Sequence, residues 1–207
     1  MIIFMSDILC ITNRKLCRGN FLDRIRGIAA CHPRGIILRE KDLTESEYKS
    51  LAAEVLSICS KNNAQCILHN FYEAAAELGA GAIHLPLSVL RNINDEHKKL
   101  FTTIGASCHS VEDALEAESL GCTYITAGHI FDTECKKGLP GRGLEFIRKI
   151  CNAVSVPVYG IGGINSDNAD LVRSMGVSGL CIMSGIMQCN DVGAYLGNLT
   201  ISSRSIN

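Results

Sequence analysis

The chain has 207 residues, with 20 basic against 21 acidic side chains. A chain of this length can bury roughly 70% of its unfolded surface around one core, so we expect a single domain over residues 1–207. The balanced charge gives no basic stripe for nucleic acid or acidic lipid. No run approaches the ~18 apolar residues of a membrane span, and residues 1–5 are too short and uncharged for a secretory signal. The sequence therefore predicts a cytoplasmic protein without nucleic-acid or membrane partners.

Eleven cysteines are spread along the chain, and no two of them form a Cys-x-x-Cys pair. Zinc and iron–sulfur sites normally show closely paired ligands. Most of these cysteines lie inside apolar runs, where cysteine acts as a small hydrophobe. We interpret them as reduced thiols in a reducing compartment. Cys108 and Cys135 are the exceptions, because they lie near the candidate site and leave open whether either contacts a ligand.

The chain alternates between two kinds of apolar pattern. Short apolar runs predict strands at 8–12, 35–38, 65–68, 82–85, 103–107, 122–125, 156–161 and 179–183. Apolar residues three and four apart predict helices at 21–30, from 44 to about 58, and at 74–78, 111–120, 143–153, 166–174 and 185–199, with one or two helical turns within 87–98. The second helix begins with a capping-box pattern, Thr44 to Glu47. Residues 200–207 are polar and are expected to fray.

Eight strands without alternating polarity favour parallel strands that are covered on both faces. The α/β pattern predicts a closed (β/α)8 TIM barrel, at the short end of its length range. A doubly wound sheet is the alternative, and it would place Gly-x-Gly-x-x-Gly near the first strand. The glycine-rich turn at 160–165 has a different spacing and follows the seventh strand.

Polar residues stand at the predicted strand ends, which meet on one face of such a barrel. They are Thr12, Arg39, Lys41, His69, Asn70, His84, Ser107, His109, His129, Gly162, Gly163, Ser184 and Gly185. The bare N–H groups of Gly162–Gly163 and Ser184–Gly185 suit a phosphate, with two tight turns as the alternative. Lys41 could be a solvated loop lysine, and His84, inside an apolar run, is more often a packed side chain than a catalytic one.

The loop over residues 126–143 follows the sixth strand and contains four glycines. Glycines let a backbone turn sharply and approach a ligand closely. Lys136 and its neighbouring cations could hold an anion, and His129 could carry a proton near neutral pH. A solvated loop is the alternative interpretation, and the position of this loop at the end of a barrel strand favours a functional site.

Five stretches resemble one family, in order and over nearly the whole chain. They cover residues 38–41, 105–110, 128–138, 157–164 and 183–186. These stretches are similar to the thiamine phosphate synthase/TenI superfamily. The resemblance implies a (β/α)8 barrel and a homodimer.

The resemblance also separates two branches. Synthases of this superfamily join a pyrimidine diphosphate to a thiazole phosphate with Mg²⁺, and typically have Asn-Asp after the third strand and an acidic residue after the fourth. Here those places hold His69-Asn70 and residues 86–89, without a carboxylate, the group that chiefly binds Mg²⁺. Synthases usually have Gly-Pro where this chain has Gly128-His129, and the pattern at 128–143 instead resembles the TenI-like thiazole tautomerases.

In those tautomerases the histidine that matches His129 is assigned proton transfer. These enzymes convert a carboxy-dihydrothiazole ethyl phosphate into its aromatic tautomer, without a metal or other cofactor. The resemblance thus implies that His129 is catalytic and that the partner is a small thiazole phosphate. We expect the substrate to be bound by Arg39, Lys41, His69, Ser107, Lys136, Gly162, Gly163, Ser184 and Gly185. Two alternatives remain open: a Mg²⁺-dependent thiamine phosphate synthase, and a non-catalytic thiazole-phosphate-binding regulator, although the chain has no helix-turn-helix signal for DNA.

Overall fold

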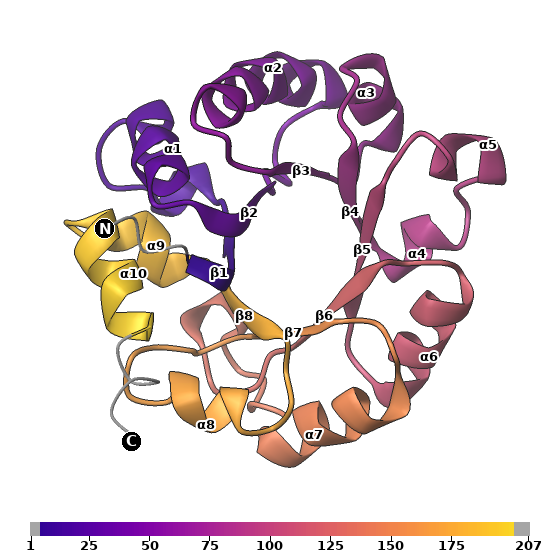
Figure 1. The fold of residues 1–207 in the computed structure, drawn as a ribbon, viewed down its shortest axis with the longest axis vertical. Coiled ribbons are helices and arrows are strands. Elements are labelled where there is room, and N and C mark those ends of the chain that lie inside the picture. Colours follow the sequence, from indigo (N-terminus) through magenta and orange to yellow (C-terminus); the bar gives the residue numbers. More distant parts are fainter. Residues whose placement is uncertain (1–4, 201–207) are drawn as a thin grey trace.

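The structure is a computed structural model that describes residues 5–200. Within that range, eight parallel strands form a closed barrel in which each strand pairs with its neighbours in chain order and β8 pairs with β1 (Figure 1). Helices connect the strands and surround the barrel (Figure 1). The prediction of a (β/α)8 barrel is confirmed. The tail that was expected to fray lies outside the described residues except for Thr200, and so do residues 1–4.

The elements follow the predicted order closely. The strands are β1 (Met5–Ile11), β2 (Pro33–Leu38), β3 (Cys66–His69), β4 (Ala82–Pro86), β5 (Thr103–Cys108), β6 (Tyr124–Gly128), β7 (Val158–Ile161) and β8 (Gly179–Ile182). The helices are α1 (Phe21–Ala30), α2 (Glu45–Lys61), α3 (Tyr72–Glu77), α4 (Leu87–Leu90), α5 (Asp95–Lys98), α6 (Val111–Ser119), α7 (Leu144–Ala153), α8 (Ala169–Arg173), α9 (Ser184–Gln188) and α10 (Val192–Thr200), with 3₁₀ turns η1 (Arg14–Leu16) and η2 (Glu134–Lys136). Strand β6 continues to Gly128, past its predicted end at 125, so the candidate loop begins at His129.

Successive strand residues belong to two cores, because they point to opposite faces of the sheet. In β1, Ile8 and Cys10 pack outward with helix residues, whereas Leu9 and Ile11 join the cluster inside the barrel. That inner cluster consists of Leu9, Ile11, Ile37, Ile67, Ala82, Tyr124, Tyr159 and Cys181. Burial on both faces explains why the strands read as continuous apolar runs.

The prediction of one last helix over 185–199 was wrong. The structure has α9 and α10 instead, and Cys189 between them has an extended backbone. Asp191 accounts for the break, because its side chain accepts a hydrogen bond from Ala194 N–H at 2.9 Å and so caps a new helix. The connection between β7 and β8 also differs: α8 begins at Ala169 rather than near 166, after a turn in which Asn168 Oδ1 accepts from Asn165 N–H at 2.9 Å.

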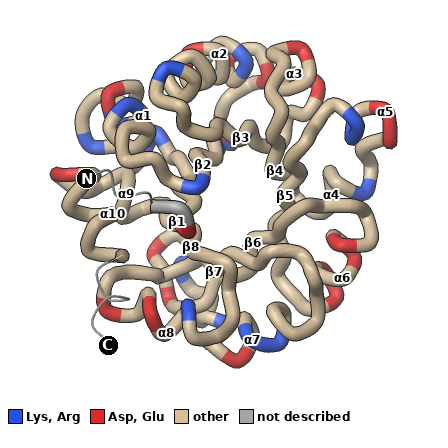
Figure 2. Tube along the Cα trace, in the orientation of Figure 1, with Lys and Arg blue, Asp and Glu red and all other residues tan. Residues whose placement is uncertain are grey.

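Charges of both signs are interspersed along the outer helices, and the barrel strands carry few of them (Figure 2). Of the helices in the described range, none has the length and apolar character needed to cross a membrane. All eleven cysteines lie within residues 5–200 as free thiols, and six of them are buried, among them Cys10 and Cys181 in barrel strands.

Candidate active site

A cavity of about 470 Å³ opens at the carboxyl ends of the barrel strands. The structure brings all ten sequence-predicted site residues to its wall: Arg39, Lys41, His69, Ser107, His129, Lys136, Gly162, Gly163, Ser184 and Gly185. Cys108 and Cys135 line it as well. The geometry places these residues around one space, while the role of each in binding or catalysis stays a prediction.

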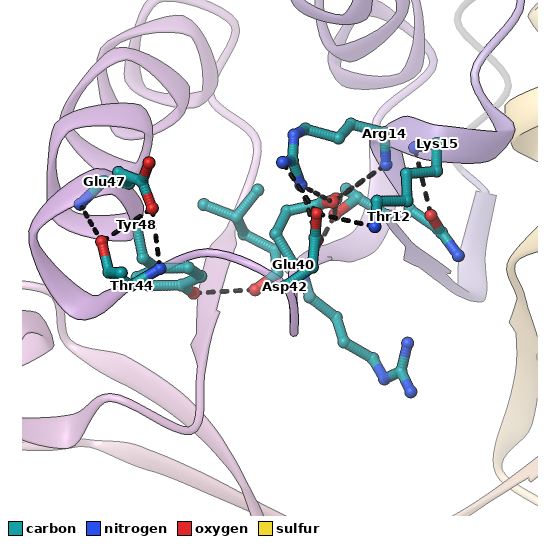
Figure 3. A network of polar contacts seen from close by, with 11 residues as sticks. Thr12, Arg14, Lys15, Glu40, Asp42, Thr44, Glu47 and Tyr48 are labelled. Carbon is teal, nitrogen blue, oxygen red and sulfur yellow. Dashed lines mark hydrogen bonds and ion pairs between the residues drawn. The ribbon is translucent and has the colours of Figure 1, made fainter.

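The ends of β1 and β2 are tied together by a buried carboxylate (Figure 3). Glu40 is 2% exposed. It accepts hydrogen bonds from the Thr12 hydroxyl at 2.6 Å and from Arg14 N–H at 3.0 and 3.1 Å. The Thr12 hydroxyl in turn accepts from Arg39 N–H at 3.0 Å. Glu40 therefore fixes the backbone from which the Arg39 side chain enters the cavity.

Three cations converge on this part of the wall. Burial lowers the pKa of Lys41, and the charges of Arg39 and Lys136 lower it further. Burial likewise lowers the pKa of Arg39, against the opposing influence of Glu40 and Cys135. Cations held near one another in partly buried positions favour an anionic ligand between them.

His69 at the end of β3 is held by a tyrosine from the outer helix α2. The Tyr48 hydroxyl donates to the carbonyl of Leu38 at 2.7 Å and accepts from His69 N–H at 2.7 Å, so it lies between two neighbouring strand ends. Burial, together with nearby His84 and Arg39, places the pKa of His69 well below its usual value. His69 is therefore a neutral group at the cavity wall.

His129 follows β6 directly and is 8% exposed. Its Nε2 lies 3.2 Å from the carbonyl oxygen of Leu139. Because a carbonyl only accepts, Nε2 carries the hydrogen and Nδ1 of the neutral ring is the proton acceptor. The β7 turn packs against this residue: Gly162 has φ +103°, and a Cβ there would overlap Cα and Cβ of His129. A glycine is required for this close approach.

The glycine pair after β7 presents free donors. Within residues 5–200, no hydrogen bond uses the backbone N–H of Gly162 or Gly163. Ser184 and Gly185 open helix α9, where first-turn N–H groups have no partner inside the helix. All four residues line the same cavity. Their N–H groups are therefore candidates for binding one anion together.

Crystals soaked in phosphate or sulfate are expected to show the anion at these four N–H groups. Gly163→Ala should weaken phosphate binding, since φ is +67° there and a Cβ would lie 2.7 Å from the Asp132 carbonyl oxygen. Gly176→Ala is the matched control, because Gly176 has φ +91° but a Cβ there would lie 3.7 Å from Cys151 Cβ and the residue does not line the cavity. Density only at surface lysines, or equal loss in both variants, would contradict the site.

Two charged residues at the wall were not predicted from the sequence. Arg91 follows α4 and pairs with Glu116 at 2.6 Å. Asp113 accepts a hydrogen bond from His109 N–H at 2.8 Å. The stretch containing Arg91 has only a weak helical pattern. Asp113 could have been found from the Ser110-x-x-Asp spacing, which is typical of a helix start.

Enzymes with a (β/α)8 barrel have their active sites at the carboxyl ends of the strands. The fold and the polar groups of this cavity therefore place the protein in the class of barrel enzymes. The profile of the family described as thiamine monophosphate synthase matches residues 8–186. The chain belongs to this family, which also includes the TenI proteins.

Similar proteins carry synthase names. The thiamine-phosphate synthase of Clostridium tetani is 31% identical over 196 residues, covering 92% of each chain. That of Ruminiclostridium cellulolyticum is 35% identical over 160 residues, covering 75% of this chain and 74% of the relative. Among solved structures, the thiamine phosphate pyrophosphorylase of Pyrococcus furiosus superposes with a TM-score of 0.80 at 29% identity, covering 94% of each chain.

The family resemblance implies Mg²⁺ for a synthase, and the residues present here do not fit that ion. Asp113 is the one Asp or Glu on the cavity wall within the described range, and one of its oxygens already accepts from His109 N–H. Between residues 5 and 200, no group of three or more His, Cys, Asp or Glu side chains is arranged so that it could hold a metal ion. Mg²⁺ takes carboxylate ligands, and the ends of β3 and β4 supply His69 and Pro86 in their place.

Proposed function

We propose that this protein is a thiazole tautomerase, which isomerises a carboxy-dihydrothiazole ethyl phosphate to the aromatic carboxythiazole ethyl phosphate. The observation that carries the proposal is the position of His129, which shares one cavity with free N–H donors, the cations Arg39, Lys41 and Lys136, and a single carboxylate. This arrangement offers one proton carrier, one phosphate site and cations for a second anionic group.

The reaction moves one proton. The hydrogen on ring carbon C2 lies next to a carboxylate, a sulfur and an imine, so the anion left by its removal is delocalised. Nδ1 of His129 takes this proton and returns it to the exocyclic carbon, while Arg39 and Lys41 stabilise the developing charge. The ring becomes aromatic, which drives the isomerisation forward, and the bonding electrons balance without an oxidant or reductant.

The second candidate is thiamine phosphate synthase, and the names of the relatives favour it. One assay separates the two candidates. The purified protein is given the dihydrothiazole phosphate alone, and in a parallel reaction the aromatic thiazole phosphate with the pyrimidine diphosphate, each with and without Mg²⁺.

We expect Mg²⁺-independent tautomerisation and little thiamine phosphate, because the cavity lacks the carboxylates for the ion. Product formation in the second reaction that is rapid and requires Mg²⁺ would overturn the tautomerase assignment. It would establish the synthase instead.

A further inference from the structure

A chain of three hydrogen-bonding side chains crosses the inside of the barrel beneath the cavity. His84 on β4 places Nδ1 3.0 Å from the Tyr124 hydroxyl on β6 and Nε2 2.9 Å from Ser107 Oγ on β5. His84 and Tyr124 are 3% and 6% exposed. Gly105 makes room for them, because a Cβ at that position would overlap Tyr124 and His84 Nδ1. The space is thus shaped around the pair.

The hydrogen-bond donors and acceptors around the His84 ring favour one of its two neutral tautomers. Among the side chains that the structure describes, the Tyr124 hydroxyl has no hydrogen-bond partner other than His84 Nδ1. If Nδ1 carried the hydrogen, the buried hydroxyl hydrogen of Tyr124 would have no acceptor, and an unsatisfied buried donor costs about 1–3 kcal/mol. Tyr124 therefore donates to Nδ1, and Nε2–H donates to Ser107 Oγ.

This tautomer leaves the Ser107 hydroxyl as a donor. Its oxygen already accepts from His84, and no other partner of Ser107 Oγ lies within the described residues. Ser107 lines the cavity, so the remaining O–H is available to a ligand acceptor. Burial and the nearby charge of Arg39 lower the pKa of His84 to about 3, which keeps the ring neutral during the reaction.

We propose that His84, held by Tyr124, is a positioning residue that fixes Ser107 as a hydrogen-bond donor to a carboxylate oxygen of the ligand. The inference rests on the proposed function for the identity of that carboxylate. Ser107 pairs with Thr126 on β6, the strand that ends just before His129. A carboxylate held by Ser107 therefore places the ring carbon that bears it beside the strand end that carries His129.

The placement also orients the ligand across the barrel. The free N–H groups lie after β7 and β8, whereas Ser107 lies on β5, two strands from β7 and three from β8 in the ring of eight (Figure 1). A phosphate on one side and a carboxylate on the other match the two ends of the proposed substrate.

The test compares two ligands by titration: the carboxythiazole ethyl phosphate and the same thiazole phosphate without its carboxylate. A hydrogen bond to a charged group is worth about tenfold or more in affinity. Ser107→Ala and His84→Leu should each lose about that factor for the carboxylated ligand only. The double variant should lose no more than Ser107→Ala, because His84 acts through Ser107. His84→Gln, whose amide can still donate to Ser107, should recover most of the affinity.

A second readout addresses the tautomer directly. Nitrogen-15 NMR of the folded protein should show His84 with hydrogen on Nε2 and bare Nδ1, and Tyr124→Phe should release this preference without touching the cavity wall. Equal losses for both ligands, additive effects in the double variant, or hydrogen on Nδ1 would overturn the inference.

The proposed function is judged separately. Carboxylate preference that depends on Ser107 without any tautomerisation by the wild type would reject the function and keep the inference. Tautomerisation by the wild type without a Ser107-dependent carboxylate preference would keep the proposed function and reject the inference. Failure of the wild type to bind either thiazole phosphate would overturn both.

Discussion

His129→Asn is expected to slow tautomerisation by about 10²–10⁴-fold, the usual cost of removing a general acid–base group. The amide cannot accept and return a proton, although it keeps the polarity of the position. Affinity for the aromatic carboxythiazole phosphate should stay nearly unchanged, because that product no longer exchanges the proton. The measurements are the turnover rate with the dihydrothiazole phosphate and the dissociation constant of the aromatic product.

His97→Asn is the matched control, since His97 lies on the short outer helix α5 and not on the cavity wall. Its turnover should equal that of the wild type. If His129→Asn keeps wild-type turnover, His129 only positions the ligand and the proposed proton transfer is wrong.

Glu40→Ala should produce the largest loss of stability among single changes at the cavity mouth. The carboxylate is 1% exposed in its side chain, and its removal leaves the Thr12 hydroxyl and Arg14 N–H without their acceptor. Unsatisfied donors and a broken, partly buried ion pair with Arg14 together cost about 3 kcal/mol in the free energy of unfolding. Denaturant unfolding of the two proteins measures this difference.

Asp42→Ala provides the comparison, because Asp42 pairs with the same arginine at 2.6 Å from an exposed position (Figure 3). Exposed ion pairs contribute little to stability, so this variant should unfold close to the wild-type midpoint. Similar losses in both variants would show that the ion pair with Arg14, and not the buried hydrogen bonds, holds the strand ends together.

The barrel and its cavity wall could be predicted because both depend on local patterns. Eight apolar runs define the strands, and the residue that follows each run must lie at the common mouth. The break between α9 and α10 was missed because Asp191 interrupts a continuous apolar pattern and acts only through its cap. His84 was expected to be a packed side chain, which its burial confirms. Its hydrogen bonds with Tyr124 and Ser107 could not be predicted, since they depend on the ring order of three strands.

Tyr48 does not line the cavity, yet it controls the distance between two of the strand ends that form the cavity wall. One phenolic oxygen bridges the Leu38 carbonyl and His69 N–H, so a side chain from α2 sets the spacing between the strand ends that carry Arg39 and His69. Tyr48 itself is not among the residues that line the cavity. A redesign for a bulkier ligand would therefore begin with this tyrosine and the seating of its helix, before any residue that the ligand touches.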